Sequence, residues 1–535
     1  MKPHSLFLSA VISFSFAISL NAQDQILPSV KNAADPFTRD GNPTSGSNDK
    51  PPEKPYMIYS LVEFIEVPTD DWLAYAGSHP VHYDATELRA EVQRWIVAGK
   101  AKPIEITSLP TKSGNRAVIE SILERRYPIE YLPANPRPVP TTFETRNSHF
   151  TFEWEPSGDL GGKSIDSNSA ANLVNYVGEV AVPFSAPSET QPVELTQPRF
   201  VNVKQSITSS LTPNVPVLLQ VSTPSDGAGK RREGVRLLNF FRAAAFPIPE
   251  IAKELKESTL DYLDNGKRVS MKKTQWDELL KAAKSDPTAK AKADDIREQF
   301  RQGMATFSNS RLTLEVQRLE VKLSDLNAWY AGKPLETATS GLQAAAMEWV
   351  RGGRGRIVDH QASVTRSGNR SVWEDIHEVR YVTEYDVEGE TPQIELPRNI
   401  KPNTVAEQLQ VLTLNRSAKI AMQKDPAVSP KSFETRNTGY TVEYEPIIEQ
   451  GTATVSMQIA VGDTKLVGHV ACYQREVNGK MQTAIEQPIF ATMKVSTNLS
   501  VTLGKPALLG INTPMEDDMK PSADRRILTF VSAQD

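Results

Sequence analysis

The side chains that most often carry out chemistry in proteins are few in this chain, and they are not spaced as a reaction centre. The sequence holds seven histidines and one cysteine, and the histidines show no metal-ligand spacing. It contains no nucleophile elbow, phosphate-binding loop or paired-cysteine zinc pattern. We therefore predict no catalytic, cofactor-binding or metal-binding residues, and a protein that is not an enzyme.

Two short features invite a chemical interpretation, and each has a simpler one. His377 lies beside Asp375 and Glu378, but the related segment described below has Leu123 at the histidine position. That difference favours a local polar or solvent-facing histidine over a catalytic or metal-binding one. The run from Gly352 to Gly355 is glycine-rich, but it closes a predicted helix, whereas a phosphate site lies where a helix opens.

Cys472 is the only cysteine in the chain, so no internal disulfide can form. Stability must therefore come from core packing. We expect a buried, inert thiol, and pairing with a cysteine of another molecule is the alternative.

The chain contains related sequence twice, as a first and a second repeat. The pentapeptide Phe-Glu-Thr-Arg-Asn at 143–147 recurs at 433–437, and the same shift of 290 relates Gln197-Pro198 to Gln487-Pro488. Upstream, residues 111–116 recur at 365–370 with a shift of 254. The repeated unit is far longer than a solenoid repeat, so we expect each copy to pack its own core.

The Glu and Arg of the pentapeptide could form a polar pair at the start of a strand. A general acid–base role would need a second convergent group, which the sequence does not identify. Because both repeats carry the motif, a structural role is the favoured interpretation.

The elements of each repeat read as a sheet with one covering helix. A helix is predicted from near Asp84 to Gly99, with its apolar residues on one face, and the second repeat places a matching helix before Gly353. We expect Trp95 and Trp349 to anchor the core, with ligand platforms as the alternative. Period-two alternation predicts half-buried strands, at Phe150, Phe152, Trp154, Tyr440, Val442, Tyr444 and from Ala453 to Val461.

Two segments break the repeat. Residues 249–300 are rich in charge, and Pro287 separates two helix-like stretches. We predict a helical connector there, with binding of a partner helix as the alternative. The difference between the two shifts, 36 residues, places an addition to the second repeat between Tyr385 and Phe433.

Composition and the N-terminus indicate the class of protein. Lys and Arg number 60 against 65 Asp and Glu, with a formal net charge of −5, so nucleic-acid binding is not predicted.

Residues 1–22 read as a signal peptide, with an apolar run from Leu6 to Leu20; a retained N-terminal anchor is the alternative. Residues 23–54 read as a disordered linker rich in Pro, Asn and Ser.

Three stretches of the second repeat resemble the β-domain of bacterial secretins, the outer-membrane proteins of type II and type III secretion systems. These stretches are Ser367 to Tyr385, with its Ser-Gly-Asn-Arg start, Thr438 to Pro446, and Gln487 to Gly510. The resemblance implies an α+β fold of two tandem secretin-like units. Each would be a mainly antiparallel β-sheet with a covering helix, and a helical connector would join them.

The predicted organisation is a signal peptide at 1–22, a linker at 23–54, a secretin-like repeat at 55–243, the connector at 244–305 and a second repeat at 306–535. We expect a non-enzymatic exported envelope protein that acts by β-mediated assembly or by docking to a secretion or envelope component. Its partners would be envelope or secretion-system proteins or further copies of itself, in the periplasm or outer membrane of a Gram-negative-type cell, or outside it; membrane association stays open. The alternative is a monomeric periplasmic or extracellular module that binds a peptide or glycan.

Overall fold

The computed structural model describes residues 56–132, 138–158, 163–184, 193–226, 230–248, 259–301, 306–308, 311–388, 427–448, 453–477, 479–516 and 518–534. The predicted signal peptide and linker lie outside the described residues, and so does segment 389–426, which contains most of the addition to the second repeat.

Both repeats fold with the same order of elements, except that one strand of the second repeat corresponds to two shorter strands of the first. The first comprises β1 (Tyr56–Pro68), α1 (Thr69–Ser78), α2 (Thr86–Val97), β2 (Lys102–Thr107), β3 (Pro110–Lys112), β4 (Ala117–Leu132), β5 (Val139–Gly158), β6 (Ile165–Phe184), β7 (Val193–Leu211), β8 (Val217–Ser222) and β9 (Val235–Pro247). The second comprises β13 (Arg311–Lys322), α5 (Leu323–Tyr330), α6 (Leu335–Arg351), β14 (Gly355–Arg366), β15 (Ser371–Glu388), β16 (Ala427–Ile448), β17 (Thr454–Val477), β18 (Lys480–Thr502), β19 (Ala507–Asn512) and β20 (Arg525–Gln534). We call residues counterparts when they are related by a shift of 254 up to the end of β4, or of 290 from β5 onward.

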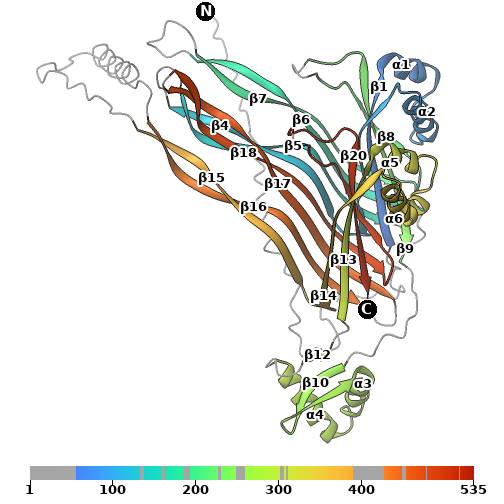
Figure 1. Ribbon diagram of the computed structural model, residues 1–535. Coiled ribbons are helices and arrows are strands. Elements are labelled where there is room, and N and C mark those ends of the chain that lie inside the picture. Colours follow the sequence, from blue (N-terminus) through green and yellow to red (C-terminus); the bar gives the residue numbers. More distant parts are fainter. Residues whose placement is uncertain are drawn as a thin grey trace, which may run out of the picture. The chain divides into compact units, whose positions relative to one another are not determined.

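The strands of the two repeats form one long sheet and two small ones, all with antiparallel pairing. Each repeat has its own small sheet, in the order β2-β1-β9-β8 with β3 beside β1, and β14-β13-β20-β19. The long strands of both repeats join in a single sheet, in the order β15-β16-β17-β18-β4-β5-β6-β7. Figure 1 shows these long strands side by side, with α1, α2, α5 and α6 near the small sheets. The predicted α+β class with mainly antiparallel sheet is confirmed.

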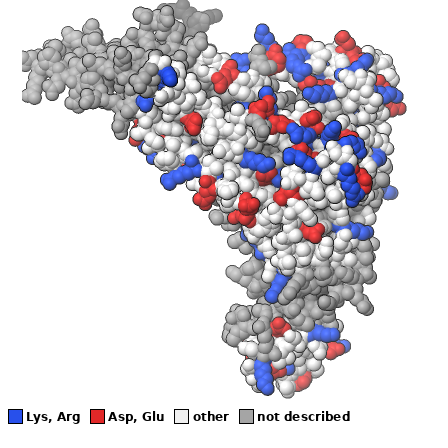
Figure 2. Space-filling model, in the orientation of Figure 1, with Lys and Arg blue, Asp and Glu red and all other residues white. Residues whose placement is uncertain are grey.

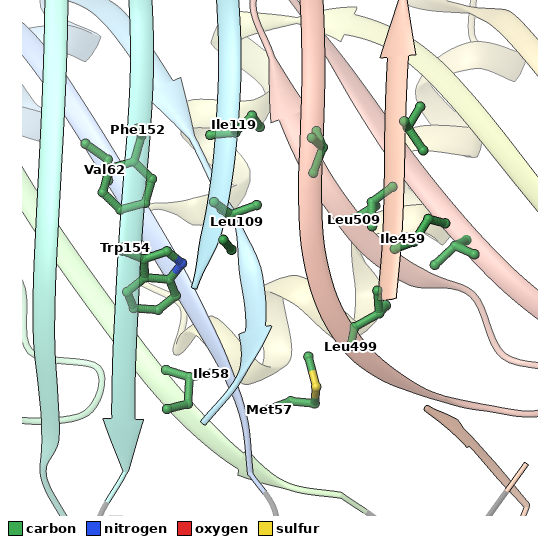
Figure 3. Close-up of a cluster of buried hydrophobic side chains, with 14 of the residues drawn as sticks. Met57, Ile58, Val62, Leu109, Ile119, Phe152, Trp154, Ile459, Leu499 and Leu509 are labelled. Carbon is green, nitrogen blue, oxygen red and sulfur yellow. The ribbon is translucent and has the colours of Figure 1, made fainter. Parts of the chain in front are cut away.

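The two repeats share the largest buried cluster, which corrects the expectation that each would pack its own core; a smaller cluster around Trp95 belongs to the first repeat alone. Val118 to Arg125 of β4 pair with Ile489 to Ser496 of β18, so the sheet continues from one repeat into the other. Figure 3 shows Phe152 and Trp154 of the first repeat and Ile459 and Leu509 of the second in one buried cluster. The apolar faces of both repeats lie on one continuous sheet, and they are therefore buried together.

The sequence pattern correctly indicated the inward residues. Trp95 and Trp349 are buried, and the helices they anchor are followed by Gly99 and Gly353, both with positive φ. Each alternating run predicted as a strand is buried on its apolar positions. Packing of these side chains against the sheet follows from period-two and period-3.6 spacing.

The long sheet divides at one position in each repeat. β5 pairs with β6 only up to His149, and β16 pairs with β17 only up to Gly439, its counterpart. Both residues have positive φ, 82° and 110°, and a Cβ on Gly439 would lie 2.1 Å from the Asp375 carbonyl oxygen. Beyond this point the hairpins β4–β5 and β15–β16 leave the neighbouring strands of their own repeat.

Residues 256–309 form a separate compact unit. It has a three-stranded sheet of β10 (Thr259–Asp264), β11 (Lys267–Lys272) and β12 (Thr306–Ser308), with α3 (Lys273–Ala282) and α4 (Pro287–Arg301). The two helices and their separation at Pro287 match the prediction, but the description as a purely helical connector is wrong. Leu260 and Tyr262 of β10 pack on Trp276 and Ile296, so the charged helices cover a small sheet.

Candidate functional site

The residues considered for chemistry do not come together. His377 is exposed on β15, as the comparison with Leu123 predicted. Gly353 has a φ of 71° and follows the last turn of α6, so this glycine run ends a helix. Among the described residues no group of His, Cys, Asp and Glu side chains is arranged to hold a metal ion.

Cys472 on β17 is half-buried, where the sequence predicted a buried, inert thiol. It packs beside Tyr473 and Ile485 at the far end of the long strands. Burial raises the pKa of its thiol to about 12, which leaves almost no thiolate at neutral pH.

We predict that the native protein reacts with a thiol reagent at pH 8 at least about 100-fold more slowly than the urea-unfolded chain, because only the thiolate is nucleophilic. A colorimetric disulfide reagent measures both rates. Equal rates in the two states would contradict this account of Cys472.

The repeated pentapeptide has a role that the sequence did not disclose. In the second repeat it lies inside β16, and its charged side chains contact β4 of the first repeat. Glu434 accepts a hydrogen bond from the Tyr381 hydroxyl at 2.9 Å and forms an ion pair with Arg126 at 3.5 Å. Arg436 forms an ion pair with Glu124. The predicted Glu–Arg pair within the motif is therefore replaced by two pairs between the repeats.

The division of the sheet places these side chains. Because β16 leaves β17 at Gly439, its outer half lies with β15 over β18. Gln487 fixes this layer by donating from its amide to the Val382 carbonyl at 3.0 Å, and Tyr381 packs on Phe490 at 5.7 Å between ring centroids. The counterpart Gln197 donates to the Pro128 carbonyl at 3.0 Å in the first repeat. The repeated Gln-Pro motif thus holds the two layers together.

A signal for these contacts was present in the sequence. Glu-x-Arg occurs at 144–146 and 434–436 in the pentapeptide, and again at 124–126 and 378–380. Two such runs placed antiparallel bring each carboxylate opposite a guanidinium. Recognising this complementarity requires knowing that β4 and the β16 segment meet, which local spacing does not reveal.

We call the junction of Val118–Arg125 with Ile489–Ser496, together with the contacts that flank it, the internal seam. On its small-sheet side, Glu105 of β2 is fully buried. It accepts hydrogen bonds from the Thr513 hydroxyl at 2.7 and 2.8 Å and lies 3.6 Å from the Arg526 guanidinium and 3.2 Å from His149. The Thr107 hydroxyl donates to the Ile511 carbonyl at 2.6 Å.

Charge within the seam sets the ionisation of Glu105. Burial alone would raise the pKa of this carboxyl, but the nearby Arg526 and His149 and the hydrogen bonds from Thr513 outweigh it and hold the pKa below its ordinary value. The seam is therefore a specific polar interface within an apolar core, with an ionised carboxylate at its centre.

The long sheet ends at two strands that have no partner on their outer side along most of their described length, β7 and β15. β15 meets β5 only at Glu384, opposite Thr142. The second repeat exposes apolar side chains at this edge and near it. Val372 on β15 is 50% accessible, and Val364 on β14, the edge strand of the small sheet, is 69% accessible, while the Pro110 counterpart of Val364 is buried. Unpaired backbone groups and exposed apolar residues make these edges the candidate functional site.

Charge marks no further site on the described part of the face shown in Figure 2. Figure 2 shows basic and acidic residues interspersed over the described part of that face. None of the described helices is both long enough and apolar enough to cross a bilayer.

Comparison with known proteins adds no family to these observations. No protein-family model matches this chain. No curated protein matches it either, so the resemblance to secretins stays a prediction made from the motifs.

Proposed function

We propose that this chain is a non-enzymatic exported envelope protein that acts through the open edges of its long sheet. β7 and β15 each present backbone donors and acceptors to a further strand. The open edges at both ends of one eight-stranded sheet are the observation that carries the proposal.

We further propose that each repeat is a secretin-like module, and that the protein belongs to the periplasm or outer membrane of a Gram-negative-type cell. The signal-peptide pattern at 1–22 and the three secretin-like stretches support this. The element order of the two repeats, which differs only in that β14 corresponds to both β2 and β3, supports a doubled module. The unit at 256–309 would then separate the two modules in sequence without belonging to either.

We predict that the mature chain, purified without residues 1–22, forms assemblies whose mass is several times that of one molecule. Size-exclusion chromatography with light scattering measures that mass. Val364→Lys with Val372→Lys will reduce it, because charge on an edge strand opposes further pairing, while Val97→Lys on the 81% exposed position of α2 will not. A strict monomer at high concentration would contradict the proposal.

Binding of a peptide or glycan by a monomer is the second candidate function. A cavity of about 180 Å³ lies between the outer ends of β4, β7 and β17, lined in part by Tyr127, Tyr131 and Tyr176. This volume is below the roughly 300–1,000 Å³ of typical small-molecule sites, so the cavity supports the binding role less well than the open edges support assembly. A ligand that binds the monomeric chain and is lost on Tyr176→Ala would reverse that order.

A further inference from the structure

The internal seam shows how two repeats join within one molecule. It pairs the last long strand of the second repeat, β18, with the first long strand of the first repeat, β4. The two open edges are the remaining pair of the same kind: β7 is the last long strand of the first repeat, and β15 is the first long strand of the second.

We infer that the partner at these edges is a second copy of this chain, joined in the register of the internal seam. β7 of one molecule would pair antiparallel with β15 of the next, from Arg199 opposite Val379 to Ser206 opposite Val372. These are the counterparts of Ile489 opposite Arg125 and Ser496 opposite Val118. The inference rests on the proposed assembly and names its partner and geometry.

The charges at the two open edges match those of the seam. The pair Glu124–Arg436 corresponds to Glu378 of one molecule and Arg146 of the next, and both counterparts are exposed. Because both side chains are exposed, burial within one molecule does not require an opposite charge beside either of them. A second seam would require Glu378 of one molecule and Arg146 of the next to carry charges of opposite sign, as they do.

A second ion pair repeats the correspondence. Arg126–Glu434 corresponds to Arg380 of one molecule and Glu144 of the next. Glu144 accepts a hydrogen bond from the Tyr127 hydroxyl, as Glu434 does from the Tyr381 hydroxyl. The carboxylate of Glu144 is therefore held by the same kind of contact as the carboxylate that forms the ion pair in the seam.

On the small-sheet side of the seam, the counterparts of the paired residues again carry complementary charge. Glu105, which lies beside Arg526, corresponds to Asp359, and Arg526 corresponds to Arg236. Lys112 donates to Ser456 at 2.6 Å across the seam, and the counterparts of these two residues are Arg366 and Asp166. These contacts of the internal seam are thus matched by pairs that can form between molecules.

Apolar side chains are buried at the internal seam, and their counterparts at the open edges are exposed. Phe143 is 7% exposed because it packs on Tyr385 of the other repeat, with ring centroids 5.9 Å apart. Its counterpart Phe433 is 48% exposed, and the counterpart of Tyr385 is Tyr131 at the opposite edge. Joining two molecules would cover Phe433 as Phe143 is covered now.

This contact is heterologous, because each molecule uses β7 on one side and β15 on the other. Successive molecules therefore add head to tail, and they form a ring if the rotation closes or a filament if it does not. A symmetric two-molecule contact between like edges is not the expected assembly.

Charge reversal tests the pairing directly. Arg146→Glu alone places two carboxylates at every junction, and Glu378→Arg alone places two guanidinium groups there. We expect each single variant to lower the apparent association constant about tenfold or more. An equimolar mixture of the two will restore assembly, because alternating molecules then place opposite charges at both junctions.

The matched control is Lys100→Glu, an exposed cation whose counterpart Arg354 pairs with Asp325 of its own repeat. It will leave assembly unchanged. Circular dichroism of each single variant, together with rescue in the mixture, separates a lost junction from a misfolded chain.

Crosslinking tests the register. In a Cys472→Ser background, Asn202→Cys with Ile376→Cys places two thiols opposite each other, as Thr492 and Ile122 lie in the seam, and oxidation will give a ladder of linked chains. Asn202→Cys with Glu378→Cys, two residues out of register, will link poorly.

The outcomes separate the inference from the proposed function. Assembly of the natural chain with no effect of the reversals and no in-register crosslink overturns the second seam and leaves edge-mediated assembly standing. A natural chain that stays monomeric overturns both. Rescue in the mixture together with the ladder supports both.

Discussion

Replacing Glu105 with Ala is expected to lower the free energy of unfolding by about 3–5 kcal/mol, the cost of breaking a buried ion pair. The change leaves the fully buried Arg526 guanidinium without its carboxylate and removes the acceptor of the Thr513 hydroxyl. Urea denaturation of the unassembled protein measures the loss. The matched control is Glu153→Ala, which removes an exposed ion pair with Arg116 and should cost no more than about 1 kcal/mol.

The same carboxylate predicts a pH dependence. The folded state holds the pKa of Glu105 below the ordinary 4.5, so this group stabilises the fold fully above about pH 5 and loses that contribution as pH falls through its folded-state pKa. The stability difference between the natural chain and Glu105→Gln should therefore be constant from pH 5 to 7 and shrink below pH 4.5. A difference that does not change with pH would contradict the assigned ionisation.

Asp463→Ala should also cost about 3–5 kcal/mol, because it leaves a buried arginine without its partner. Arg318 on β13 donates to Asp463 on β17 at 2.7 Å, and both side chains are buried. The Arg318 guanidinium also lies over the Tyr440 ring, 5.1 Å from its centroid.

The first repeat supplies the compensating variant. The counterparts of Arg318 and Asp463 are Phe64 and Leu173, both buried, and Phe64 packs edge-on to Phe150, the counterpart of Tyr440. Arg318→Phe with Asp463→Leu should therefore restore stability to within about 1.5 kcal/mol of the natural chain, or exceed it. A double variant as unstable as Asp463→Ala would show that the two repeats differ in packing here, despite their common topology.

Local features of this protein were largely determined by its sequence. Alternation at Phe150, Phe152 and Trp154 predicts a strand with one buried face, and the spacing around Trp95 predicts a helix that ends at Gly99. Such patterns depend on residues within a few positions of one another, and the structure has them as predicted. The element order common to both repeats also follows from the shifts of 254 and 290.

Only the tertiary structure decided how the repeats meet. Sequence likeness predicted two cores, but the pairing of β18 with β4 and the burial of Glu105 beside Arg526 depend on residues several hundred positions apart. Periodicity cannot report such contacts, because a strand that is internal to a sheet and one at its edge have the same alternation. For the same reason the Glu-x-Arg runs show complementary charge but not which runs meet. The sequence therefore did not reveal that Glu434 and Arg436 contact the other repeat, or that Glu144 and Arg146 lie near an open edge.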